Sequence, residues 1–294
     1  MGLRLLIVFC VLFLFISCGD QQESKSYKNI YDDLGNELSL TKDINRIISL
    51  APNLTEIIFH IGCGDKLVGV TRFCDYPQET KEKEIVGDML NVNFEKIVEL
   101  NPDLVFITVE GNTKLTFDRL KSLGINVFVT NPRNIQGIKK SIKDLSLIFN
   151  KVQIADSVLK DIEFRLQNVK KLKLKNTSGL FIVSLNPLMV AGKNTFINEI
   201  LESVNIRNIA SNLNANYPVI SREDLIIQNP EILILSSLEK ENLQEIIRHY
   251  PEWKNIKAIK ENKVIFVDEN IFFRPGPRFI LAVEFLASEL KKFG

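Results

Sequence analysis

A helix–turn–strand pattern occurs twice in this chain and limits the fold to one built from two similar α/β units. The first copy, NFEKIVELNPDLVFI, occupies residues 93–107, and the second, SREDLIIQNPEILIL, occupies residues 221–235. In each copy a helix-capping residue (Asn93 or Ser221) precedes a short amphipathic stretch, an Asn-Pro pair ends that stretch, and an aliphatic run follows. Each copy therefore predicts a short helix followed by a buried strand.

Other strands and helices are predicted to alternate around the two copies. A hairpin is expected around residues 33–36; strands are expected at 46–50, 67–70, 126–130, 180–184 and 264–267, and helices at 54–61, 114–123, 195–204 and 278–292. Such alternation is typical of α/β lobes with a mostly parallel sheet. Ligands of these sheets bind beyond the carboxyl ends of the strands, so two facing lobes would enclose a cleft.

A long helical segment separates the two units. Apolar residues recur every three or four positions from Ile135 to Leu172, with Asn150 as the place where the helix could break. Residues 151–173 alone would span ~35 Å as a helix, which is enough to cross between lobes. We therefore expect an N-terminal lobe at residues 29–133, a linking helix at 134–175 and a C-terminal lobe at 176–294.

The first 17 residues have the features of a secretory signal peptide. Arg4 precedes an unbroken apolar run, Leu5 to Ile16, that is shorter than the ~20 residues needed to span a bilayer. Ser17-Cys18 follows at once and resembles a bacterial lipobox, although Phe15 stands where Leu is usual. We expect Cys18 to be lipidated and residues 18–28 to form a flexible tether. Plain secretion and an uncleaved anchor are the alternatives.

Charge and cysteine content narrow the choice of partners. Without Arg4 the chain keeps 36 basic residues against 36 acidic ones. This balance, without a Lys/Arg-rich run, argues against a nucleic acid partner. With Cys10 in the leader and Cys18 at the processing site, only Cys63 and Cys74 remain. They could form a disulfide or stay as two partly buried thiols.

The usual signatures of enzymes are missing from the sequence. No GxSxG, GxxxxGK[ST], GxGxxG or HExxH motif occurs, and the only histidines are His60 and His249. So few imidazoles also disfavour a transition-metal site. A binding protein without a metal or cofactor of its own is therefore favoured over an enzyme.

Several predicted loops combine aromatic, amide and cationic residues. They are 73–76, 216–218 and 272–278, and the last carries RPGPR from Arg274 to Arg278. Aromatic rings and an arginine suit a large ligand that is partly flat and partly polar. Phe272 and Phe273 could equally belong to the core.

These residues resemble a known family. RIISLAPNLTEIIFHIG, LVGVTRFCDYP, NFEKIVELNPDLVFI, YPVISREDL and RPGPR occur in the order and spacing of the periplasmic solute-binding proteins of ABC importers for cobalamin and ferric siderophores. The resemblance covers residues 30–294 and is greatest to the cobalamin-binding branch. It implies the class III fold, in which two Rossmann-like lobes are joined by one long helix, and an exported, monomeric protein that delivers a corrinoid to a permease and its ATPase.

The resemblance also implies a ligand site. Phe73 falls where the cobalamin branch has a Tyr on the ligand, Met89 and Tyr217 where it has Trp residues, and Asn270 where it has an Asp. Arg274 is identical to the family's Arg and could hold a carboxylate, phosphate or amide oxygen. Because the other four differ, a ferric siderophore or haem remains an alternative ligand, and a chelatase-like enzyme acting on a tetrapyrrole is a more distant one.

One acidic residue holds the same place in both copies of the repeat. Glu95 lies six residues before Asn101, and Glu223 lies six before Asn229. Acids in the first turn of a helix are favoured by its dipole, which is sufficient to explain them. The family resemblance implies a second role, because glutamates at these positions meet arginines of the permease.

Overall fold

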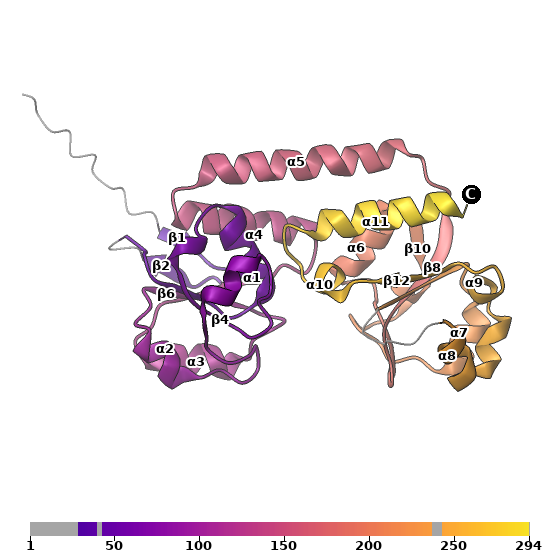
Figure 1. The fold of residues 1–294 in the computed structure, drawn as a ribbon, viewed down its shortest axis with the longest axis horizontal. Helices are drawn as coiled ribbons and strands as arrows, with labels where there is room; N and C mark the ends of the chain where they lie inside the picture. Colours follow the sequence, from indigo (N-terminus) through magenta and orange to yellow (C-terminus); the bar gives the residue numbers. More distant parts are fainter. Residues whose placement is uncertain (1–28, 40–42, 237–242, 294) are drawn as a thin grey trace, which may run out of the picture.

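The computed structural model of the protein describes residues 29–39, 43–236 and 243–293 (Figure 1). The expected signal peptide, Cys18 and the tether lie outside the described residues. Within them, no helix is both long enough and apolar enough to cross a membrane.

The N-terminal lobe is built on a parallel sheet with strand order β5-β4-β3-β6-β7. Its strands are β3 (Ile47–Ser49), β4 (Leu67–Val70), β5 (Glu84–Ile85), β6 (Leu104–Thr108) and β7 (Val127–Thr130). Its helices are α1 (Pro52–His60), α2 (Phe94–Glu99) and α3 (Lys114–Ser122), with short 3-10 turns at Gly64–Lys66 and Gln78–Glu82. The expected hairpin forms from β1 (Asn29–Tyr31) and β2 (Glu37–Ser39).

The C-terminal lobe has a second sheet, with parallel order β10-β8-β11-β12 and β9 antiparallel to β8. The strands are β8 (Thr177–Leu185), β9 (Leu188–Val190), β10 (Ile206–Asn208), β11 (Ile232–Ser236) and β12 (Val264–Val267). The helices are α6 (Phe196–Ser203), α7 (Arg222–Gln228), α8 (Leu243–His249), α9 (Lys257–Lys260), α10 (Glu269–Phe272) and α11 (Phe279–Lys292), with 3-10 turns at Ile209–Asn212 and Pro251–Asn255. Strand β9 was not predicted from the sequence, which suggested only a loop there.

The linking segment contains two helices rather than one. They are α4 (Ile135–Ile148) and α5 (Val152–Lys171), and the chain turns between them at Asn150, whose φ is 53°. Only α5 runs along both lobes (Figure 1), and its 20 residues span ~30 Å. Helix α4 packs against α1 of the N-terminal lobe and against α5. The break that the sequence allowed at Asn150 is confirmed.

The two copies of the repeat fold alike. The Asn before each proline adopts a left-handed conformation that ends its helix, with φ of 44° at Asn101 and 45° at Asn229. The acid after each proline then fastens its strand to the neighbouring one. Asp103 Oδ2 accepts a hydrogen bond from the backbone N–H of Arg46 at 2.9 Å, and Glu231 Oε2 accepts one from Ser178 N–H at 3.0 Å.

One continuous apolar core extends from the N-terminal sheet to the C-terminal sheet. It includes Phe106 and Phe128 of the first sheet, Phe181 and Ile234 of the second, and buried side chains of α1, α4, α5, α6 and α11. The opposite face of each sheet has its own smaller core. The lobes are therefore held together by packing on the side of the linking helices, while their other ends face one another.

Candidate functional site: the cavity between the lobes

A cavity of about 560 Å³ lies between the lobes. The N-terminal lobe contributes residues that follow β3, β4, β5 and β6, and the C-terminal lobe contributes the loop before α7 and the loop after β12. The lining residues are Pro52, Asn53, Phe73, Met89, Thr108, Glu110, Gly111, Asn216, Tyr217, Glu269, Asn270, Phe273, Arg274 and Pro275. The cavity therefore lies at the carboxyl ends of the strands, where the sequence led us to expect a cleft.

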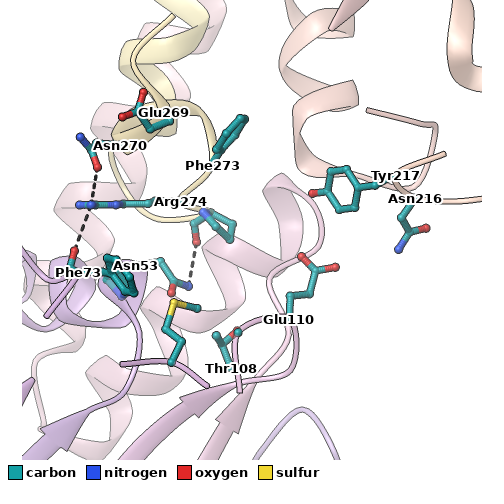
Figure 2. A pocket seen from close by; sticks show the side chains of 14 residues that line it. Asn53, Phe73, Thr108, Glu110, Asn216, Tyr217, Glu269, Asn270, Phe273 and Arg274 are labelled. Carbon is teal, nitrogen blue, oxygen red and sulfur yellow. Dashed lines mark hydrogen bonds between the residues drawn. The ribbon is translucent and has the colours of Figure 1, made fainter. Parts of the chain in front are cut away.

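The structure brings all five predicted ligand-binding residues into this cavity. Phe73 and Met89 belong to the N-terminal lobe, and Tyr217, Asn270 and Arg274 belong to the C-terminal lobe. Figure 2 shows Phe73, Tyr217, Asn270 and Arg274 around the cavity. Phe73 is half exposed, so part of its surface is open to contact with a ligand. That these residues contact a ligand stays a prediction.

Met89 is fixed by a polar side chain behind it. The Asn112 amide nitrogen donates to the carbonyl of Met89 at 2.9 Å and to that of Leu50 at 3.2 Å, while its oxygen accepts from Thr108 N–H at 2.9 Å. Asn112 is buried, and its bonds with Thr108 and Leu50 are shielded from water. The turn that carries Met89 is thereby tied to the ends of β3 and β6.

Tyr217 is positioned by backbone pairing with the C-terminal sheet. Gly192 N–H donates to Asn216 O at 2.7 Å, and Val190 N–H donates to Pro218 O at 3.0 Å. Burial raises the pKa of Tyr217 to about 12, with Glu110 raising it further and Arg133 opposing the shift. The phenol therefore stays protonated at neutral pH, and its hydroxyl points toward the side of the cavity that carries Phe273 (Figure 2).

Arg274 links the two lobes. One of its amino groups donates to Asp75 at 2.5 Å and lies 3.4 Å from Glu56; the other donates to Phe73 O at 3.1 Å and to Asn270 Oδ1 at 2.5 Å (Figure 2). Its side chain is only 12% exposed. The sequence suggested a guanidinium available to a ligand, whereas both amino groups already have protein partners.

A buried carboxylate anchors this network. Glu56, in α1, is 1% exposed and accepts a bidentate pair of hydrogen bonds from Arg278, at 2.9 and 2.5 Å. The Arg278 guanidinium also lies over the ring of Tyr76, 4.1 Å from its centroid. Because Glu56 and Tyr76 belong to one lobe and Arg278 to the other, these contacts join the two lobes.

Sequence reasoning missed part of this site. It did not single out Glu56, Asn53, Thr108, Glu110, Gly111 or Glu269. Glu110, Gly111 and Glu269 come within three residues after a strand, which is a signal that could have found them. Glu56 was recognisable as a lone acid in the apolar stretch LTEIIFH. Of the two uncertain aromatics, Phe272 is core and Phe273 lines the cavity.

The described residues contain neither a candidate metal site nor a disulfide. No group of three or more His, Cys, Asp or Glu side chains there could hold a metal ion. Cys63 and Cys74 are free and buried, so the disulfide alternative is wrong. Burial raises the pKa of the Cys74 thiol, and hydrogen bonds with Thr55 and Thr71 oppose the shift.

The two acids of the repeat, Glu95 and Glu223, lie on exposed surface at the starts of α2 and α7. The helix starts are capped by other groups. Asn93 accepts from Lys96 N–H at 3.0 Å, and Ser221 and Asp224 form a reciprocal capping box. Within the described part of the chain, neither Glu95 nor Glu223 has a hydrogen bond or ion pair.

Two facing lobes with a cavity at their strand ends, joined by a helix, define a bilobed ligand-binding protein. The sequence pattern described as "Periplasmic binding protein" matches residues 47–271, and the chain belongs to that family. This confirms the family resemblance and the fold that it implied. The chain is a binding protein and not an enzyme.

Individual relatives agree with this assignment. The chain is 32% identical over 297 residues to an uncharacterized ABC transporter substrate-binding lipoprotein, YvrC, of Bacillus subtilis, covering 94% of this chain and 93% of that one. It is 32% identical over 242 residues to the vitamin B12-binding protein of Vibrio campbellii, covering 81% and 86%.

Solved structures give the same fold. The periplasmic vitamin B12-binding protein BtuF of Vibrio cholerae superposes with a TM-score of 0.75 at 26% identity, covering 85% of this chain and 98% of that one. The periplasmic haem-binding protein RhuT of Roseiflexus superposes with a TM-score of 0.77 at 21% identity, covering 85% and 99%. The second likeness concerns the fold alone.

Proposed function

We propose that this protein is the substrate-binding component of an ABC importer and that it captures a corrinoid for delivery to the permease. The observation that carries the ligand assignment is the chemistry of the cavity. It offers Phe73, Met89, Tyr217 and Phe273 as apolar contacts, and the one cationic side chain among the described lining residues, Arg274, has both amino groups engaged. The similarity to vitamin B12-binding proteins supports the same choice.

Charge argues for a corrinoid over haem. A haem carries two propionates, which need cationic or hydrogen-bonding partners when they leave water. The cavity instead adds two acids to the engaged Arg274, namely Glu269 and Glu110, the second of which is paired with Arg133 at 3.1 Å. A corrinoid presents mostly neutral amide groups around its ring, and Asn53, Asn216 and Asn270 can exchange hydrogen bonds with amides. The same reasoning disfavours strongly anionic ferric siderophores.

A calorimetric titration of the purified protein with cyanocobalamin, haem and a ferric siderophore tests the ligand assignment. Nanomolar binding requires about 12 kcal/mol. Truncating an aromatic anchor costs roughly 2 kcal/mol, so Tyr217→Ala should weaken corrinoid binding at least tenfold. Haem binding that is tighter than corrinoid binding, or an unchanged affinity in Tyr217→Ala, would contradict the assignment.

We further propose that Glu95 and Glu223 dock the protein onto the permease. Both acids are exposed, both helices are capped without them, and α2 and α7 lie on the side of the molecule away from α5 (Figure 1). Loss of one partner of a desolvated interfacial ion pair costs ~2–5 kcal/mol, whereas an exposed pair contributes ~0–1 kcal/mol. Glu95→Gln and Glu223→Gln should each weaken permease binding more than tenfold. Binding within twofold of the parent would leave only the helix-start role.

The membrane attachment is proposed on the sequence of residues 1–18 and on the similarity to a lipoprotein of Bacillus subtilis. We propose that Cys18 becomes the N-terminus and is lipidated. Two acyl chains on it would anchor the protein stably, whereas one chain would not. Cys18→Ser should move the protein from the membrane fraction to the soluble fraction. An unmodified peptide spanning residues 1–20 in a mass spectrum of the purified protein would contradict this.

A further inference from the structure

A second hollow lies on the N-terminal lobe, outside the cavity between the lobes. It has a volume of about 570 Å³ and is formed by the end of β5, the turn that follows and the start of α2. Its lining residues are Arg72, Ile85, Gly87, Leu90, Asn91, Val92, Asn93 and Phe94, none of which lines the first cavity. The hollow is therefore a separate surface feature.

The hollow exposes apolar side chains to solvent. Leu90 is 69% exposed and Ile85 is 49% exposed, and Phe94 contributes a third apolar side chain to the lining. Its one cationic group, Arg72, lies 3.7 Å from the carboxylate of Asp88 and so already has a partner. Exposed apolar side chains gathered in a hollow that also has polar lining are a feature of interaction sites, because burying them removes apolar area from water.

Hydrogen bonds hold the recess in shape. Asp88 N–H donates to Asn91 O at 3.0 Å, and Asp88 Oδ1 accepts from the N–H groups of Leu90 and Asn91 at 2.9 and 2.6 Å. Asn93 N–H donates to Val86 O at 2.9 Å. Because the turn is fixed before a partner arrives, little conformational entropy is lost on binding.

The same turn serves the ligand cavity. Met89 lines the cavity between the lobes, while the next residue, Leu90, lines the outer hollow. The chain then continues through Phe94, also in the hollow, directly to the exposed and unpartnered carboxylate of Glu95. The recess thus adjoins the acid proposed to dock the permease.

We propose that this hollow is part of the permease-docking surface and receives an apolar side chain of the permease next to the cation that meets Glu95. The charge supports this occupant, since Arg72 of the hollow has Asp88 as a partner and Glu95 beside the hollow has none, which favours a segment carrying an apolar residue and a Lys or Arg. The inference rests on the proposed importer function and adds a docking contact to it.

Two neighbouring residues give a sharp test. The parent and its variants are measured for cyanocobalamin affinity by calorimetry. Their affinity for an importer complex, isolated from the native membrane by its binding to the parent protein, is measured by surface plasmon resonance. Leu90→Ser should weaken binding to the complex about tenfold and leave ligand affinity within twofold. Met89→Ala should weaken cyanocobalamin binding. When the ligand is saturating, it should leave binding to the importer complex unchanged. Leu115→Ser is the matched control, because Leu115 is 75% exposed on α3 of the same lobe, outside the hollow.

Two results would overturn the proposal. One is binding of Leu90→Ser to the complex within twofold of the parent. The other is self-association of the parent, seen by analytical ultracentrifugation and lost in Leu90→Ser, which would assign the hollow to a second copy of this chain. If the parent fails to bind cyanocobalamin, the ligand assignment fails, but complex binding by the unloaded protein still tests the hollow.

Discussion

The two lobes share a scaffold but bring different chemistry to the cavity. The N-terminal lobe supplies Phe73 and Met89, whereas the C-terminal lobe supplies Tyr217, Asn270 and Arg274. These side chains belong to loops, turns and the short helix α10, which have no counterpart in the repeated sequence. In contrast, the residues that lie at equivalent points of the two repeats have other roles. They are the helix caps, the acids Asp103 and Glu231 that bond to a neighbouring strand, and the exposed acids Glu95 and Glu223.

This difference separates two tasks within one fold. The repeat places two acids at equivalent surface points, which a two-sided partner can recognise, and the unrepeated loops line the cavity that we propose binds the ligand. The charged network around Glu56 is a third feature, which joins a helix of the N-terminal lobe to a loop of the C-terminal lobe. Changes in the loops, in the network and in the repeat should therefore have separable effects.

The largest expected effect comes from the network. Glu56→Gln leaves Arg278, 13% exposed, without its buried counter-charge, and breaking a buried pair typically costs 3–5 kcal/mol. We expect a loss of about 3 kcal/mol in the free energy of unfolding, measured by urea denaturation. Asp75→Asn is the control, since the Asp75 side chain is 51% exposed and its loss should cost ~0–1 kcal/mol. Equal losses in the two variants would contradict the role of Glu56.

Two glycines test the cavity walls, one in each lobe. A Cβ on Gly192 would lie 2.3 Å from the backbone oxygen of Ala215, so Gly192→Ala must shift the loop that carries Tyr217. A Cβ on Gly111 would meet only the flexible end of Met89, at 1.9 Å, besides Thr108 at 3.0 Å. We expect Gly192→Ala to weaken corrinoid binding at least tenfold, about 1.4 kcal/mol, and Gly111→Ala to weaken it less. The reverse order in calorimetry would show that the N-terminal wall dominates.

The smallest expected effect concerns Glu231, the acid that follows the Asn-Pro pair of the second repeat. The hydrogen bond from Lys257 and that from Ser178 N–H lower the pKa of Glu231 to about 2, while burial opposes the shift. A carboxyl with a lowered folded-state pKa stabilises the fold above its unfolded value of about 4.3, and this contribution is lost as pH falls toward 2. The parent should therefore be more stable than Glu231→Gln at pH 6, with the gap closing between about pH 4.3 and 2. A gap independent of pH would contradict this.

Much of the fold could be predicted because local signals agreed with the final packing. The strands at Leu67–Val70 and Val264–Val267 have the predicted bounds, and both repeat copies form the expected helix and strand. Strand β9 escaped prediction because three residues after Asn186-Pro187 carry too little pattern, and its pairing with β8 decides its form.

The candidate site was predictable in position but not in its bonding. Strand ends pointed to the cavity, and the family resemblance named five residues that the structure brings together. The role of Arg274 could not be foreseen, because its partners Asp75 and Glu56 are about 200 residues away in sequence and meet it only after the lobes pack. Long-range charge pairing leaves no local pattern.

The separation of ligand capture from docking is tested most directly by one double variant. Glu95→Lys with Glu223→Lys is compared with the parent for cyanocobalamin affinity and for uptake in proteoliposomes containing the importer. We expect ligand affinity within twofold of the parent and uptake abolished, since neither residue lines the cavity and both acids would become repulsive to a cationic partner. Normal uptake, or ligand affinity that falls together with uptake, would contradict the account.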